Sequence, residues 1–303
     1  MDDALHLTRE ELREYHRSLS NWGRWGERDQ LGTLNLLTPE ARAAAAAGVR
    51  SGRTVSCARA LDTVTSADNP RPALHMMTST ATEGSGGDWF GLAHHGYATS
   101  HIDALCHIFA GESLYNGYPV DRVTARGAVE LGIHHLRDGI VGRGVLLDVP
   151  RALDREYLEA GTAIGPDDLD RAEQACGVEV RSGDLLLVRT GRWRERARRG
   201  PWDPHAELAG LHARCLPWLH ARGVAALGSD GVSDVVPSRV EGERLPIHAT
   251  AIPIMGLHLL DNLDLEDLAR ACREERRCDF LLTIAPLVLE GGTGSPVNPI
   301  AVF

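Results

Sequence analysis

Four histidines and one aspartate lie within the segment from His94 to His107. Inside it, His101, Asp103 and His107 follow an H-x-D-x-x-x-H spacing. Neutral imidazoles and carboxylates are ligands that suit Zn²⁺ or Mn²⁺. His107 need not be a ligand, because an imidazole titrates near neutral pH and could move protons beside a metal. The spacing favours a metal site over the alternative that these are plain surface or core histidines of a chain that has 14 of them.

Polar and apolar residues alternate from Leu92 to Asp103, a pattern that predicts a strand. Side chains two residues apart lie on the same face of a strand. We therefore expect one face to carry His95, Tyr97, Thr99, His101 and Asp103.

A second group of acidic residues and histidines lies far down the chain. Asp230 follows an apolar run that is typical of a buried strand, and loops at strand ends often carry sites. A metal site needs three or four protein ligands, so His248 and Asp261 could complete one that His101 and Asp103 begin. The alternative is that Asp261 caps a following helix and Asp230 holds a turn. Spacing leaves both interpretations open.

Strand and helix patterns alternate over the second half of the chain, which predicts a mixed α/β class with some parallel pairing. We expect buried strands at residues 142–149, 184–188, 224–228 and 280–286, and helices at residues 9–18, 38–49, 166–177 and 206–221. One domain over residues 1–303 is expected, with residues 1–60 packed on it as an N-terminal helical extension.

Composition narrows the classes of function. The 42 acidic residues outnumber the 32 basic ones, so nucleic acid is not an expected partner. All basic residues are arginines, which excludes lysine chemistry; the cluster from Arg189 to Arg199 could bind an anionic substrate group. No apolar run reaches the roughly 18 residues of a membrane span. The acidic start at residues 1–4 is unlike a signal peptide, and six scattered cysteines indicate reduced thiols, so a cytoplasmic location is expected.

The H-x-D-x-x-x-H segment resembles the signature H-x-G-T-H-x-D-x-P-x-H of the cyclase family, which includes bacterial kynurenine formamidase and isatin hydrolase. Further segments similar to the family, in family order, are DQLGTLN at 29–35, GDLLLVRTG at 183–191, GSD at 228–230 and GSPVNP at 294–299. The resemblance covers nearly the whole chain. It implies an α/β fold of the swivelling β/β/α type, and an enzyme that forms homodimers or higher homo-oligomers.

The resemblance also implies roles for individual residues. His101 and Asp103 match metal ligands, and His107 matches the acid/base histidine. His248 fits a further histidine ligand, and Asp261 takes the place of a glutamate with a shorter side chain. The family's first histidine falls on Tyr97 here, and His95 is the nearest substitute. With Leu105 in place of the motif proline as well, the chain is expected in a longer, divergent subgroup.

The implied function is that of a metal-dependent hydrolase that opens a C–N or C–O bond in an amide or lactone, with an aromatic small molecule as the expected substrate. Zn²⁺ or Mn²⁺ would lower the pKa of a water so that hydroxide attacks the carbonyl, while His107 moves the proton. Tyr97 is expected to hydrogen-bond the oxyanion, and Trp89, Phe90 and Asp230 to contact the substrate. The alternatives are a metal-dependent cyclase or dehydratase, and a binding protein without catalysis.

Overall fold

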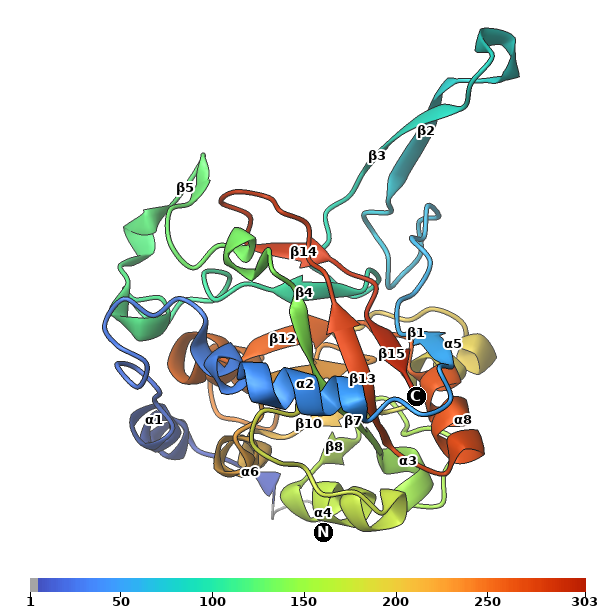
Figure 1. Ribbon diagram of the computed structural model, residues 1–303. Helices are drawn as coiled ribbons and strands as arrows, with labels where there is room; N and C mark the ends of the chain where they lie inside the picture. The colour runs from blue at the N-terminus through green and yellow to red at the C-terminus, as the bar shows by residue number, and fades with distance from the viewer. Residues whose placement is uncertain (1–4) are drawn as a thin grey trace.

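The computed structural model describes residues 5–303, so the acidic start at residues 1–4 lies outside the described residues. Within residues 5–303 the centre of the molecule is a nine-stranded mixed sheet (Figure 1). In spatial order its strands are β1 (Thr54–Ser56), β15 (Ile300–Val302), β13 (Asp279–Ile284), β7 (Ile140–Asp148), β9 (Leu185–Arg189), β11 (Ala226–Ser229), β12 (His258–Asp261), β4 (His101–Asp103) and β14 (Gly294–Pro296). The predicted mixed α/β class is confirmed.

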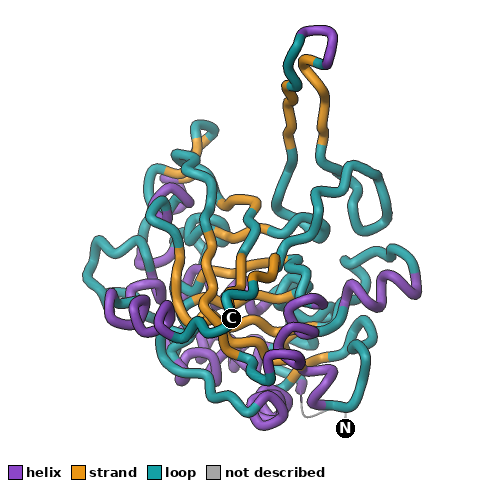
Figure 2. The backbone as a smooth tube through the Cα atoms, turned by 45° about the vertical axis from the view of Figure 1, so that its right-hand side comes forward, coloured by secondary structure: helices purple, strands orange, loops and turns teal. Residues whose placement is uncertain are grey.

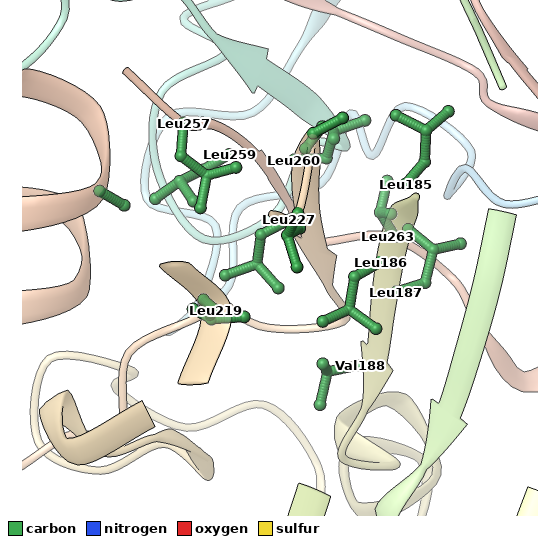
Figure 3. Packing of buried hydrophobic residues seen from close by; sticks show 14 of the residues in the cluster. Leu185, Leu186, Leu187, Val188, Leu219, Leu227, Leu257, Leu259, Leu260 and Leu263 are labelled. Atoms are coloured by element: carbon green, nitrogen blue, oxygen red, sulfur yellow. The ribbon is translucent and has the colours of Figure 1, made fainter. Parts of the chain in front are cut away.

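The four strands β7, β9, β11 and β12 are parallel and form the core of the sheet. Their registers place Val145, Leu186, Leu227 and Leu259 in one row across the sheet, and all four side chains are fully buried. Such continuous apolar runs are typical of strands that are covered on both faces. Figure 3 shows the leucines of β9, β11 and β12 packed together. The antiparallel strands β4 and β14 extend this core beyond β12.

Helices cover the sheet, and their starts follow sequence signals. They are α1 (Arg9–Ser18), α2 (Pro39–Ala47), α3 (Val149–Ala152), α4 (Pro166–Cys176), α5 (Arg192–Arg199), α6 (Leu216–Arg222), α7 (Pro246–Thr250) and α8 (Glu266–Glu275). The hydroxyl of Thr38 accepts the backbone N–H of Ala41, and Pro39 occupies the first helical position, as predicted for α2. Helix α2 then packs against β7 and β13. No helix within residues 5–303 is long and apolar enough to cross a membrane.

Among residues 5–303, three two-stranded sheets lie outside the main sheet: β2 (Leu74–Ser79) with β3 (Gly87–Gly91), β5 (Val123–Thr124) with β6 (Gly127–Ala128), and β8 (Ala163–Ile164) with β10 (Gly210–Leu211). The β2–β3 hairpin projects away from the rest of the molecule (Figures 1 and 2). Its side chains are mostly exposed along both strands.

Three elements differ from the sequence expectation. The strand expected from Leu92 to Asp103 is limited to β4, and residues 92–100 form an irregular loop. The helix expected at 206–221 begins only at Leu216, because the preceding residues pair with β8 and Val236. Residues 5–60 are not helical throughout, since β1 pairs with β15 at an edge of the main sheet. In each case pairing with distant segments overrides the local pattern.

Candidate metal centre

Strand pairing brings the two groups of candidate residues together. Strand β4 lies antiparallel to β12, and the register sets His101 opposite Asp261. Asp103 is two residues from His101 on β4, so both side chains point to the same face. All three are almost completely buried. The site therefore lies at the β4–β12 pair, where the antiparallel part of the sheet meets its parallel core.

His248 reaches the same place from α7. Its Nε2 lies 3.2 Å from Oδ2 of Asp261 and 3.6 Å from Oδ2 of Asp103. His95 arrives from the 92–100 loop, with Nδ1 3.0 Å from Oδ1 of Asp103. In the described part of the chain, two sets of three possible ligands result, His95–His101–Asp103 and Asp103–His248–Asp261. The ligand atoms of each set lie within 4.8 Å of one another. Asp103 belongs to both sets.

Several atoms at this point are buried without a hydrogen-bond partner among residues 5–303. They are both carboxylate oxygens of Asp103, Oδ1 of Asp261 and Nδ1 of His95. Nδ1 of His95 and Oδ1 of Asp103 lie 3.0 Å apart, but their contact does not have the geometry of a hydrogen bond. Leaving a buried polar atom unpaired costs about 1–3 kcal/mol, so native proteins rarely do so without a reason. Carboxylate oxygens and imidazole nitrogens that converge in this way suit a divalent cation such as Zn²⁺ or Mn²⁺. The donor set therefore fits the metal that the sequence predicts.

Outer contacts orient the two buried histidines. Nδ1 of His101 donates to the carbonyl of Thr99 at 2.8 Å, and Nδ1 of His248 lies 2.6 Å from Oδ2 of Asp234. With Nδ1 occupied, Nε2 of each ring faces the carboxylates of the site, Asp103 for His101 and both Asp261 and Asp103 for His248. Carboxylate or carbonyl partners of this kind fix the tautomer of a ligating histidine and raise its basicity. Asp234, which is fully buried, was not predicted as part of the site.

The charges of the cluster depend on one another. Burial alone would raise the pKa of Asp103, but contacts with His101, His248 and His95 hold it well below its usual range. Burial would also lower the pKa of His248, and the neighbouring carboxylates of Asp261 and Asp103 instead raise it well above its usual value. Asp103 is therefore ionised at neutral pH. Because His248 must lose its proton before Nε2 can bind a cation, metal binding should release protons.

His107 lies beside the ligand sets without belonging to either. It follows β4 in a turn, where its backbone N–H donates to the carbonyl of Ala104. Its ring stacks on that of His95 with centroids 3.7 Å apart, and its Nε2 lies 4.0 Å from Oδ1 of Asp103. Burial lowers the pKa of His107 to about 4, so the ring is neutral at pH 7. A neutral imidazole here can accept a proton.

Tyr97 is held near the centre but is not in either ligand set. Its ring packs against a small apolar cluster that includes Trp202 and Leu208. Its hydroxyl lies 3.5 Å from Nη2 of Arg244, and the ring of His205 meets it edge-on at 4.6 Å. Burial raises the pKa of Tyr97, so the hydroxyl keeps its proton and can donate a hydrogen bond.

Two residues that the sequence did not place at the metal centre brace the 92–100 loop. The amide of Asn262 donates from Nδ2 to the carbonyls of Gly96 and Thr99, at 2.8 and 3.2 Å. Its Oδ1 accepts Nη1 of Arg192, whose Nη2 donates to the carbonyl of Tyr97 at 2.7 Å. Asn262 has a φ of +55°, which asparagine tolerates better than most residues. Its place next to Asp261, directly after an apolar run, was the only sequence signal.

Asp230 serves the loop structure instead of facing a ligand. Its carboxylate is fully buried and accepts the hydroxyl and backbone N–H of Thr190 and the N–H of Gly191, all within 2.8 Å. Both oxygens are therefore occupied, which leaves none for the substrate contact expected of Asp230.

Trp89 and Phe90 lie on the projecting hairpin, where 46% and 55% of each residue is exposed. A cavity of about 120 Å³ borders His94, His95, Tyr97 and His205, and neither aromatic residue lines it. Phe90 instead lines a different cavity, with Leu287, Pro296 and Val297. Within one chain, the structure does not bring these two aromatic side chains to the candidate metal centre.

Comparisons with known proteins agree with this architecture. The Cyclase family model matches residues 54–234, whereas no curated protein matches the chain. A crystal structure described as that of a novel cyclase is 31% identical, with 95% of this chain and 99% of that chain covered and a TM-score of 0.86. Isatin hydrolase A from Ralstonia solanacearum is 23% identical over 87% of this chain and 97% of its own (TM-score 0.59). Isatin hydrolase A from Labrenzia aggregata is 19% identical over 82% and 93% (TM-score 0.54). The predicted fold type is confirmed, and the chain belongs to the cyclase family.

Proposed function

We propose that the protein is a metal-dependent hydrolase that opens an amide or lactone bond of a small molecule. The observation that carries the proposal is the convergence of His95, His101, Asp103, His248 and Asp261, which brings together possible ligand atoms that include unpartnered buried atoms of His95, Asp103 and Asp261. Proteins of the same fold are named isatin hydrolases, and isatin contains a cyclic amide. Hydrolysis of such a bond is consistent with that likeness.

The five proposed ligands would hold Zn²⁺ or Mn²⁺. A bound divalent cation supplies Lewis acidity, which polarises a carbonyl and lowers the pKa of water towards about 7. Asp103 has one oxygen near His95 and the other near His248, so it can serve both halves of the ligand set. Asp234 keeps Nδ1 of His248 occupied, so that Nε2 is the ligand atom.

His107 is the proposed acid/base residue. Its ring is neutral at pH 7 and lies against His95, so Nε2 can take a proton from the attacking water and return it to the leaving nitrogen or oxygen. Tyr97, which lines the cavity and keeps its hydroxyl proton, is a proposed hydrogen-bond donor to the substrate. Its packing against Trp202 and Leu208 restrains the ring, so the hydroxyl needs little reorganisation.

A panel of small cyclic and N-acyl amides and lactones, incubated with metal-loaded protein, tests the proposal. We expect products that have gained the mass of one water, and a loss of about 10²–10⁴-fold in turnover for His107→Gln with metal content unchanged. His135→Gln, which changes a partly buried histidine outside the ligand sets, is the control. Products with unchanged mass, or lighter by one water, would instead identify a cyclase or dehydratase. Full activity of His107→Gln would refute the assigned role.

We also propose that the functional form is a homodimer or higher homo-oligomer. Met76 and Trp89 face each other across the β2–β3 hairpin. Met76 is 57% exposed and Trp89 is 46% exposed. Two-stranded hairpins in water are marginally stable unless something covers them. A second copy of the chain would remove these apolar side chains from water.

A further inference from the structure

Arg244 lies at the edge of the cavity beside the candidate metal centre. Its guanidinium contacts two side chains that line the cavity, the hydroxyl of Tyr97 at 3.5 Å and Nδ1 of His205. Arg244 is itself exposed, and no carboxylate of residues 5–303 lies within 4.0 Å of its guanidinium.

The acidic groups around this cavity are already engaged. Asp68, which lines it, forms an ion pair with Arg196. Asp103 and Asp261 belong to the ligand sets, and Asp234 faces His248. Arg71 also lines the cavity, where its guanidinium makes a long contact with the carbonyl of His95, at 3.5 Å. Two arginines therefore add positive charge at the cavity that neighbouring carboxylates do not neutralise.

The arginine cluster at 189–199, which the sequence offered as an anion site, does not provide this charge. Arg189 is bound by Asp148 and Glu266, and Arg192 by Asn262. The remaining members of the cluster are likewise engaged, namely Arg194 with Glu266, Arg196 with Asp68, Arg198 with Glu156, and Arg199 with Glu195 and Glu207. These side chains stabilise the fold around α5.

We propose that Arg244 and the Tyr97 hydroxyl bind a carboxylate on the substrate, so that the substrates are small amides or lactones that carry a carboxylate apart from the bond that is cleaved. This inference rests on the proposed hydrolase function. A guanidinium presents a planar set of N–H donors that matches a carboxylate, and the phenol adds one more donor. His205 and the apolar cluster around Trp202 restrain these donors before the ligand arrives.

The cavity extends from this pair to His95, one of the proposed metal ligands. It is bordered by Tyr97 and His205 on the side of Arg244 and by His95 on the side of Asp103. A substrate whose carboxylate contacts Arg244 would extend towards the ligand sets with its other end. The volume of about 120 Å³ limits that substrate to a small molecule. In this arrangement Arg244 determines specificity and orients the scissile bond.

Matched ligands test the inference by binding rather than turnover. Succinamate and glutaramate carry one carboxylate and one amide, whereas succinamide and glutaramide are neutral diamides of the same length. Calorimetric titration of the metal-loaded full chain should show at least about tenfold tighter binding of the anions. Arg244→Gln should abolish this preference, and Tyr97→Phe, which keeps the ring, should reduce it. Arg244→Lys should retain part of it, because the charge remains.

Arg270→Gln is the control, since Arg270 is an exposed arginine on α8 that pairs with Asp267. It should leave the preference unchanged. Equal affinity of wild type for anions and diamides, no saturable binding of the anions, or an anion preference that survives Arg244→Gln would each overturn the inference. If the preference depends on Arg244 but no amide or lactone is hydrolysed, the proposed function fails while the anion site stands. If amides or lactones are hydrolysed without the preference, the anion site fails while the proposed function stands.

Discussion

Replacing Asp234 by asparagine changes the candidate metal centre without removing any proposed ligand. In the structure Oδ1 of Asp234 accepts the backbone N–H of Ile247 at 2.7 Å, while Oδ2 lies 2.6 Å from Nδ1 of His248. Asparagine is nearly the same size but has one oxygen and one NH₂ group. Whichever way the amide turns, one of these N–H donors then faces another donor in a fully buried place.

This geometry sets the expected magnitudes. One unpaired buried donor costs about 1–3 kcal/mol, so the free energy of unfolding of Asp234→Asn should fall by that amount. The negative charge that supports His248 is also lost. Removing such an outer partner of a ligating histidine weakens metal binding by about 10–100-fold. That factor corresponds to about 1.4–2.8 kcal/mol of binding free energy.

Competition with a chromogenic chelator at pH 7.5 measures the Zn²⁺ affinity, and urea unfolding of the same samples measures stability. Asp184→Asn is the matched control. Asp184 is equally buried and also accepts a backbone N–H, that of Arg181, together with the side chain of Arg143, but it touches no candidate ligand. Asp184→Asn should lose stability and keep its Zn²⁺ affinity. Unchanged Zn²⁺ affinity of Asp234→Asn, within about twofold, would refute the role given to Asp234.

Two further predictions concern stability and assembly. Burial lowers the pKa of His212 to about 4, from 6.5, so its contribution to folding is fully present above pH 6.5 and is lost as the pH falls towards 4. Between pH 7 and pH 5 the free energy of unfolding of wild type should therefore fall by about 2 kcal/mol more than that of His212→Gln. Urea titration of both proteins at the two pH values measures this difference. Equal decreases in both proteins would contradict the prediction. Trp89→Glu should lower the mass of the particle measured by light scattering, whereas Arg126→Glu on the β5–β6 hairpin should not. A monomeric wild type, or an unchanged mass of Trp89→Glu, would show that the β2–β3 hairpin does not mediate assembly.

The sequence predicted the parallel core of the fold because its strands are locally distinctive. The continuous apolar runs around Leu186 and Leu227 predict strands that are buried on both faces, and both side chains are fully buried in the structure. The strand predicted over residues 92–103 was wrong for residues 92–100, because alternation of polar and apolar residues also fits a loop. Hydrogen bonds from the distant residues Asn262 and Arg192 fix the conformation of this loop. Hydrogen bonds that span more than 90 residues leave no periodic trace in the sequence.

Part of the candidate site could be predicted from the sequence, because some of its residues lie in a short local motif. His101 and Asp103 share a short motif, and the structure sets them beside His248 and Asp261 through the β4–β12 register. His95 was expected on the same strand face as Asp103 but reaches it from a loop instead. Asp234 and Arg244 carried no motif at all.

The central claim is that His95, His101, Asp103, His248 and Asp261 hold a divalent metal. Metal content by mass spectrometry, on protein purified without added metal, tests this directly in wild type and His101→Ala. His75→Ala is the control, because His75 also pairs with an aspartate, Asp88, but on the exposed β2–β3 hairpin. We predict about one or two equivalents of Zn or Mn in wild type and His75→Ala, and their loss in His101→Ala. A folded wild type that contains no metal and takes up neither Zn²⁺ nor Mn²⁺ would contradict the claim.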